Sequence, residues 1–267
     1  MRSVGAATGR DALEAQVGQR FYADWTSNDH RVRRLVAETI GTFGLTFVLS
    51  GGAAILAGYG GAHLAPFQYA FILSAVSALW LVAAVYFLGD ISAHFNPAMT
   101  LAFTLRGDMG WPMALVYFVV QFATAALGSC VAAALFGYGG NLAATIPQPG
   151  QLWQAVVFEA IMTFGMVLLV LSMANGPKLN GSFVPIAVGA YVMAMGTMGG
   201  PYDGAAFNPA RAFGPDFARG DLSTYWVYPA GAVVGVIVAV LTARFLRGPA
   251  RAQEARAAMG TPLDETT

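Results

Sequence analysis

The chain has 267 residues, of which 57% are apolar and only 10% are charged, whereas a soluble domain carries about 25% charged residues. Its formal net charge is zero, and 16 of its 28 charges lie in residues 1–34 and 247–267. This composition excludes an ordinary water-soluble protein, and it gives no electrostatic reason to expect a nucleic-acid partner. We therefore expect the central block of the chain to lie in the lipid bilayer.

Six stretches are long and apolar enough to be membrane-spanning helices, which need about 20 residues. In chain order they cover residues 35–57, 67–88, 113–136, 152–174, 183–198 and 225–246, and the fifth is short. Gly, Pro and Asn residues at 58–61, 137–150 and 175–177 are typical of turns between them. Backbone groups in lipid must be satisfied within their own segment, so the spans are expected to be helices.

The positions of Arg and Lys predict the orientation, because basic residues collect on the cytoplasmic side of a membrane. With six spans, 12 of the 14 basic residues fall on the side of the two termini, and only Arg211 and Arg219 fall on the other. We expect both termini in the cytoplasm and the protein in the plasma (cell inner) membrane. The predicted organisation is a cytoplasmic tail over 1–34, a membrane domain over 35–247 and a second cytoplasmic tail over 248–267. Within the first tail, residues 11–25 fit a short amphipathic helix at the membrane interface.

The chain also repeats itself at long range. Glu-Thr-Ile-Gly-Thr-Phe-Gly, beginning at Glu38, returns as Glu-Ala-Ile-Met-Thr-Phe-Gly at Glu159, and Phe-Asn-Pro-Ala at Phe95 returns at Phe207. The two repeats cover about 35–136 and 152–246 with three spans each, so an odd number of crossings gives them opposite topology. Inverted repeats of this kind place the working site of a transport protein near the midplane, between the halves.

Glu38 and Glu159 lie inside apolar spans, where a carboxylate is costly and usually has a function. One interpretation makes them proton carriers of a coupled transporter. The other makes them acceptors that anchor irregular loops of a pore. Their symmetric placement, together with the lack of Lys or His in the spans to relay protons, favours the second interpretation.

The two Asn-Pro-Ala segments are helix-start signals, because Asn caps a helix and Pro suits its first turn. Two ordinary helix starts in loops are one interpretation. Each copy, however, follows the second span of its half and precedes an apolar segment too short to cross the membrane, at 99–105 and 211–217. We therefore predict two half-helices that enter from opposite faces and meet N-terminus to N-terminus, where irregular backbone must line a cavity.

These features resemble the aquaporins, the major intrinsic protein family, over roughly residues 34–247. The resemblance rests on Ser-Ala-His-Phe-Asn-Pro-Ala-Met-Thr over 92–100, Phe-Asn-Pro-Ala-Arg-Ala-Phe-Gly-Pro over 207–215, both Glu-containing span starts, Gln121 and Tyr225-Trp226. It implies an all-α integral membrane fold, a right-handed bundle of six transmembrane helices plus two re-entrant half-helices in an inverted 3+3 repeat. It also implies a homotetramer with one pore per subunit, and the chain carries small-residue faces suited to close helix packing, Gly231-x-x-x-Gly235 and Gly128-x-x-x-Ala132.

In this family the motif residues form the centre of the pore, and here they are Asn96, Pro97, Ala98, Asn208, Pro209 and Ala210. The resemblance implies that a passing water oxygen accepts from both Asn amides, and that the positive helix ends repel hydronium and other cations. It also places His94 on the pore wall as a hydrogen-bonding residue. No metal or other cofactor is expected, because the single Cys130 and the isolated His residues offer no ligand set.

The resemblance further implies a selectivity filter near the outer mouth, with Arg211 as its cationic member. Counting back from the second motif assigns Gly196 and Ala205 to two other positions. The fourth position comes from the second span and is either Ser77 or Val76, because the loop before the first motif is one residue shorter than the family usually has.

Strictly water-selective members fill this filter with an aromatic side chain and a His, and this chain has neither. The small residues resemble the filters of plant nodulin-like channels, and they predict a passive channel for water and small uncharged solutes such as glycerol, urea or metalloid acids. A strictly water-selective channel is the alternative. Glycerol-facilitating members usually carry Asp and a basic residue where this chain has Ala212 and Asp216, and Tyr225-Trp226 is typical of water channels.

A coupled secondary transporter would share the inverted repeat and the broken helices, and its transport would depend on an ion gradient. An enzyme is not expected, because Glu38 and Glu159 are the main titratable groups within the spans and no acid–base or nucleophile set accompanies them.

Overall fold

The computed structural model describes residues 28–174, 183–248 and Ala258. Every regular element within these ranges is a helix. The long helices are α2 (Asn28–Gly58), α3 (Pro66–Leu88), α5 (Trp111–Phe136), α6 (Leu152–Ala174), α7 (Val184–Asp203) and α9 (Val227–Arg247), and the short ones are α4 (Pro97–Arg106), α8 (Pro209–Arg219) and two 3-10 turns, η1 (Gly61–His63) and η2 (Gly139–Ala143). The predicted interfacial helix at 11–25, the turn at 175–177 and most of the predicted C-terminal tail lie outside the described residues.

The prediction of an all-α fold with long helices and two half-helices is confirmed. Two boundaries differ from the expectation. Helix α2 begins at Asn28, inside the range 1–34 predicted as a tail, because its three arginines interrupt the apolar pattern without opposing a helix. Helix α7 continues past residue 198 to Asp203 and tolerates Pro201 within its last turn, before Gly204 ends it in the left-handed conformation.

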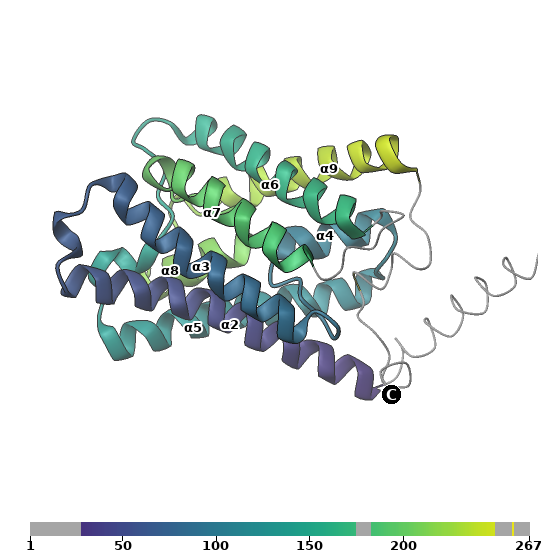
Figure 1. Ribbon diagram of the computed structural model, residues 1–267, viewed down its shortest axis with the longest axis horizontal. Helices are drawn as coiled ribbons and strands as arrows, with labels where there is room; N and C mark the ends of the chain where they lie inside the picture. The colour runs from purple at the N-terminus through teal and green to yellow at the C-terminus, as the bar shows by residue number, and fades with distance from the viewer. Residues whose placement is uncertain (1–27, 175–182, 249–257, 259–267) are drawn as a thin grey trace, which may run out of the picture.

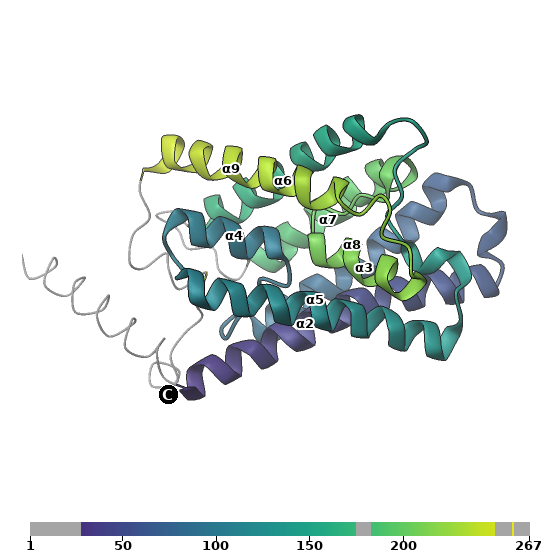
Figure 2. The same ribbon diagram turned by 180° about the vertical axis from the view of Figure 1, so that it is seen from behind.

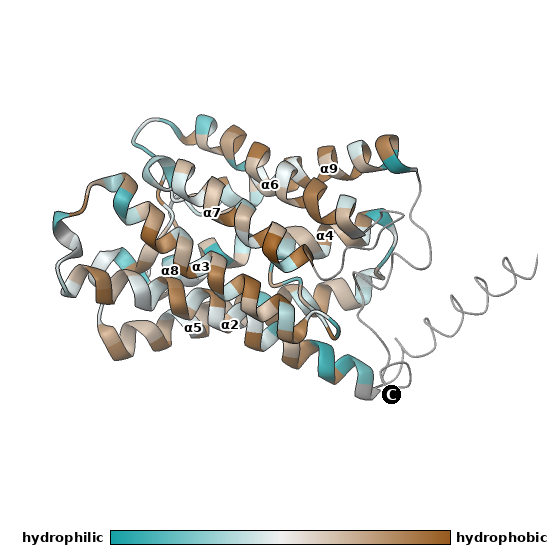
Figure 3. Cartoon of the chain, in the orientation of Figure 1, coloured by the Kyte–Doolittle hydropathy of each residue, from teal (hydrophilic) through white to brown (hydrophobic). Residues whose placement is uncertain are grey.

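The lateral surface of the bundle is apolar. Five helices of the described ranges, α2, α3, α5, α6 and α9, are long and apolar enough to cross a membrane. Large apolar side chains on them are exposed, among them Leu79, Val119 and Leu241. Figure 3 shows largely brown and pale helices, with the most hydrophilic residues mainly toward the two ends of the bundle. An exposed apolar belt of this kind matches lipid as the surrounding solvent.

The two repeats are packed crosswise. Within the first repeat α2 packs along α5, within the second α6 packs along α9, and α3 and α7 meet between the repeats. Each half-helix contacts the third long helix of the opposite repeat, so that α4 lies against α9 and α8 lies against α5. Figures 1 and 2 show α4 and α8 in opposite halves of the bundle along its long axis.

The small-residue faces noted in the sequence are filled inside the subunit. A Cβ on Gly128 would lie 2.5 Å from the carbonyl oxygen of Phe43 on α2, and a Cβ on Gly235 would lie 2.4 Å from that of Ala160 on α6. Glycine therefore permits the close α2–α5 and α6–α9 contacts. These faces do not provide a surface for contact between subunits.

Candidate channel site

The two half-helices begin at the Asn-Pro-Ala segments. Asn96 caps α4, and its Oδ1 accepts a hydrogen bond from the backbone N–H of Ala98 at 2.8 Å. Asn208 caps α8, where its Oδ1 accepts from the N–H groups of Ala210 and Arg211 at 3.0 and 3.2 Å. A proline follows each Asn at the first helical position, where its missing N–H costs nothing. The four buried residues Pro97, Ala98, Pro209 and Ala210 thus build the helix starts, and the lining of the lumen described below does not include them.

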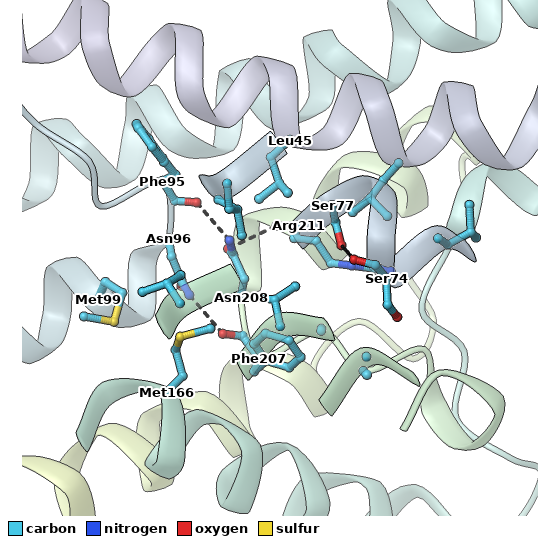
Figure 4. A pocket seen from close by; sticks show the side chains of 18 of the residues that line it. Leu45, Ser74, Ser77, Phe95, Asn96, Met99, Met166, Phe207, Asn208 and Arg211 are labelled. Atoms are coloured by element: carbon cyan, nitrogen blue, oxygen red, sulfur yellow. Dashed lines mark hydrogen bonds between the residues drawn. The ribbon is translucent and has the colours of Figure 1, made fainter. Parts of the chain in front are cut away.

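The same two Asn side chains join the half-helices to each other. Asn96 Nδ2 donates to the carbonyl of Phe207 at 2.9 Å, and Asn208 Nδ2 donates to the carbonyl of Phe95 at 2.8 Å (Figure 4). An amide NH₂ has two hydrogens, so each Asn retains a second donor. Both Asn residues line the cavity described below.

Phe95 and Phe207 have φ angles of 49° and 33°, in the left-handed region that costs a non-glycine residue roughly 1–2 kcal/mol. This conformation aims each carbonyl at the Asn of the other half. The strain requires a strong local support, which the two buried carboxylates supply.

Glu38 on α2 anchors the loop that leads to α4. Its carboxylate accepts from the backbone N–H groups of His94 at 2.7 Å and Phe95 at 2.8 Å. It also accepts from Ser92 Oγ and from Gln121 Nε2, both at 2.8 Å. The side chain is fully buried, and its four donors satisfy both oxygens.

Glu159 on α6 does the same for the loop that leads to α8. Its two oxygens accept from the N–H groups of Ala206 and Phe207, each at 2.6 Å. The two repeats therefore solve the same problem with the same residue type. Of the two interpretations drawn from the sequence, these hydrogen bonds fit the one in which the carboxylates anchor loops of a pore.

A continuous cavity of about 840 Å³ runs beside the paired helix ends. Its lining extends along the whole of α3, from Pro66 at one end to Gly89 just beyond the other, and it includes Asn96 and Asn208. The lumen therefore extends along the full length of α3. It lies on the side of the half-helices that faces α3 and α7.

The residues assigned to the filter all line this lumen. Ser77, Gly196, Ala205 and Arg211 all line the cavity. Val76, the other candidate from the second span, is not among the described lining residues, and its Cγ1 lies 3.7 Å from a Cβ built on Gly52 of α2. Gly196 and Ala205 contribute no side chain larger than a methyl group, so their side chains fill little of the lumen at these positions.

Arg211 is held by a strained turn that the sequence analysis did not single out. Its Nη1 donates to the carbonyl of Ala143 at 3.1 Å. Residues Asn141, Leu142 and Ala143 of η2 have φ angles of 53° to 57°, and the hydroxyl of Tyr69 donates to the carbonyl of Gly140 at 3.1 Å. The signal for this turn was the run Gly139-Gly140-Asn141, whose residue types tolerate the left-handed conformation best.

His94 lines the cavity, but both of its ring nitrogens have protein partners. Nδ1 lies 3.0 Å from Thr100 Oγ1, and the N–H at Nε2 donates to the carbonyl of Ala258 at 2.8 Å. The same carbonyl accepts from Arg34 Nη2 at 3.3 Å. Ala258 is buried, so this residue of the predicted C-terminal tail lies against the pore wall.

Two re-entrant half-helices, bonded end to end beside a lumen and related by an inverted repeat, define a membrane channel. Comparison with known proteins agrees. The family model described as "Major intrinsic protein" matches residues 24–242. The chain is 33% identical over 238 residues to Nodulin-26 of Glycine max, covering 88% of this chain and 82% of that protein. It is 32% identical over 221 residues to Aquaporin NIP1-1 of Zea mays, covering 81% and 75% respectively.

The fold is similar to the X-ray structure of the aquaglyceroporin from Plasmodium falciparum, with a TM-score of 0.66 and 22% identity over 79% of this chain and 94% of that one. The chain belongs to the major intrinsic protein family, the aquaporins. It is an integral membrane channel and not an enzyme, as the sequence analysis predicted.

Proposed function

We propose that this channel passes water and small uncharged solutes, such as glycerol, urea or metalloid acids, without coupling to an ion gradient. The observation that carries the proposal is the composition of the lumen wall at the residues assigned to the filter: Gly196 presents no side chain and Ala205 a methyl group, beside the cation Arg211. The names of similar proteins, Nodulin-26 and an aquaglyceroporin, lend further support.

Exclusion of protons and other cations belongs to the same proposal. The N-termini of α4 and α8 face the lumen, and each carries roughly half a positive charge from its helix dipole. Water in the lumen meets amide donors from both Asn side chains at this point. Positive half-helix ends and an arginine are recognised barriers to cations in water channels.

A strictly water-selective channel is the second candidate. It is favoured by Ala212 and Asp216, which replace the acidic and basic residues usual in glycerol-facilitating members. It is also favoured by Tyr225, whose hydroxyl donates to the carbonyl of Pro209 at 3.2 Å in the second motif.

Stopped-flow measurements on proteoliposomes distinguish these functions. Vesicles containing the channel are expected to shrink rapidly in sucrose with a low activation energy, and then to reswell in glycerol, urea or boric acid. Fast shrinkage without solute entry would establish the water-selective alternative. Uptake that requires a proton or sodium gradient would overturn the passive mechanism.

We further propose a homotetramer in the plasma (cell inner) membrane, with both termini cytoplasmic. The distribution of basic residues supports this orientation, since Arg31, Arg33, Arg244 and Arg247 lie at helix ends on one side and Arg219 is the last residue of α8, on the other. Light scattering in detergent tests the assembly. Labelling of single cysteines placed in residues 1–27 tests the orientation.

A further inference from the structure

Helices α3 and α7 approach each other closely where they form one wall of the lumen. A Cβ built on Gly196 would lie 2.5 Å from Ser74 Oγ and 3.1 Å from Ser74 Cβ. One turn further along, a Cβ on Gly200 would lie 2.7 Å from the Cβ of Ala70. The hydroxyl of Ser74 therefore occupies the volume that a side chain at position 196 would take.

Ser74 is nearly fully buried, with an exposed fraction of 6%, and it lines the cavity. Its Oγ makes no hydrogen bond to any residue that the structure describes. A buried hydroxyl without a protein partner is costly, unless water or a solute in the lumen satisfies it. The hydroxyl is therefore available to whatever passes through the constriction.

Ser77, one turn along the same helix, differs in this respect. Its Oγ donates to the carbonyl of Ser74 at 3.1 Å, so its hydrogen is used within α3. Figure 4 shows both serines on the wall near the side chain of Arg211. Of the two serine hydroxyls on α3, the one at Ser74 remains free to donate into the lumen.

We propose that Ser74 is a specificity-determining residue of the constriction. The absence of a side chain at Gly196 makes room for its hydroxyl, which both limits the width on that wall and hydrogen-bonds polyols and other small hydroxylated solutes opposite Arg211. This inference rests on the proposed passage of uncharged solutes. It differs from the sequence-based assignment, in which Ser77 is the filter residue of the second span.

The test compares the full chain with Ser74→Ala and Ser77→Ala in proteoliposomes, measuring water, glycerol and boric acid permeability. Loss of one hydrogen bond predicts that Ser74→Ala lowers glycerol and boric acid permeability about three- to tenfold, with water changed less than about twofold. Ser77→Ala is expected to have the smaller effect on both solutes. Thr242→Ala, whose hydroxyl bonds its own helix at the exposed surface of α9, controls for reconstitution.

A second pair of variants tests the width. Gly196→Ala is expected to lower both glycerol and water permeability, because the new Cβ displaces the Ser74 hydroxyl into the lumen. Adding Ser74→Ala to Gly196→Ala is expected to restore part of the loss.

Three outcomes are decisive. If the wild-type channel passes glycerol and Ser74→Ala leaves it unchanged, or if Ser77→Ala has the larger effect, the inference is wrong while the proposed function stands. If the wild-type channel passes water alone, the solute part of the proposed function fails. In that case the water permeabilities of Gly196→Ala and of the double variant decide whether Ser74 sets the width of the lumen. If adding Ser74→Ala to Gly196→Ala restores no water permeability, the inference about the width is wrong too.

Discussion

Asn96 and Asn208 are tied together through each other's backbone: each side-chain amide donates to the carbonyl of the phenylalanine that precedes the other asparagine, at 2.9 and 2.8 Å. The same side chains cap the half-helices through their Oδ1 atoms. One residue type thus fixes the helix start, the separation of the two helix ends and the donors that face the lumen.

Asn208→Asp is expected to weaken the exclusion of cations. The carboxylate loses the bond to the Phe95 carbonyl and puts a negative charge where the positive end of α8 lies. A proton and sodium leak is expected with water transport retained, measured with a pH-sensitive dye inside proteoliposomes. Asn96→Asp should behave alike because the site is symmetric, and an unchanged leak in both variants would contradict the assignment of the barrier.

Glu159→Gln is expected to destabilise the protein by about 1–3 kcal/mol, because one of two buried backbone N–H groups then faces an amide NH₂ instead of an acceptor. Glu38→Gln is expected to cost at least as much, since that carboxylate accepts four hydrogen bonds. Thermal unfolding in detergent measures both. Unchanged stability combined with loss of gradient-driven uptake would instead identify the two residues as proton carriers.

Arg211→Ala is expected to admit cations and to widen the lumen beside position 211. The change removes the positive charge and leaves the Ala143 carbonyl without its 3.1 Å partner. Proton and sodium flux should rise while osmotic water permeability is maintained or increased. Arg219→Ala is the matched control, since Arg219 lies at the end of α8, beyond the lumen lining, and pairs loosely with Asp216 at 3.9 Å.

Gly235→Val is expected to destabilise the bundle by about 1–3 kcal/mol or more, because even a Cβ would lie 2.4 Å from the Ala160 carbonyl. Gly58→Ala serves as the control, because a Cβ there meets nothing within 4 Å. The measurement is the midpoint of thermal unfolding in detergent. Equal midpoints for the two variants would show that α6 and α9 can separate without cost.

The long helices were predictable because an apolar run of about 20 residues is a strong local signal. The start of α2 at Asn28 was missed, since charged residues end the apolar pattern although they are compatible with a helix. The half-helices were predictable from Asn-Pro, which combines a cap with a first-turn residue.

The finer geometry of the site depends on tertiary contacts that no local pattern encodes. Phe95 and Phe207 have positive φ angles because distant carboxylates bind their N–H groups, and phenylalanine itself gives no such signal. The choice between Ser77 and Val76 turned on the length of one loop, which sequence counting left open. The hydroxyl of Ser74 gains its role from a glycine on another helix, more than 100 residues away along the chain.

The crosswise seating of the half-helices, α4 on α9 and α8 on α5, has a mechanical consequence. The half-helix of each repeat packs against a long helix of the other repeat, so the two repeats interlock. Secondary transporters that work by alternating access rock one repeat against the other as a rigid body. Here such a movement would have to separate both half-helices from the opposite repeat and break the reciprocal asparagine bonds, so this packing opposes alternating access.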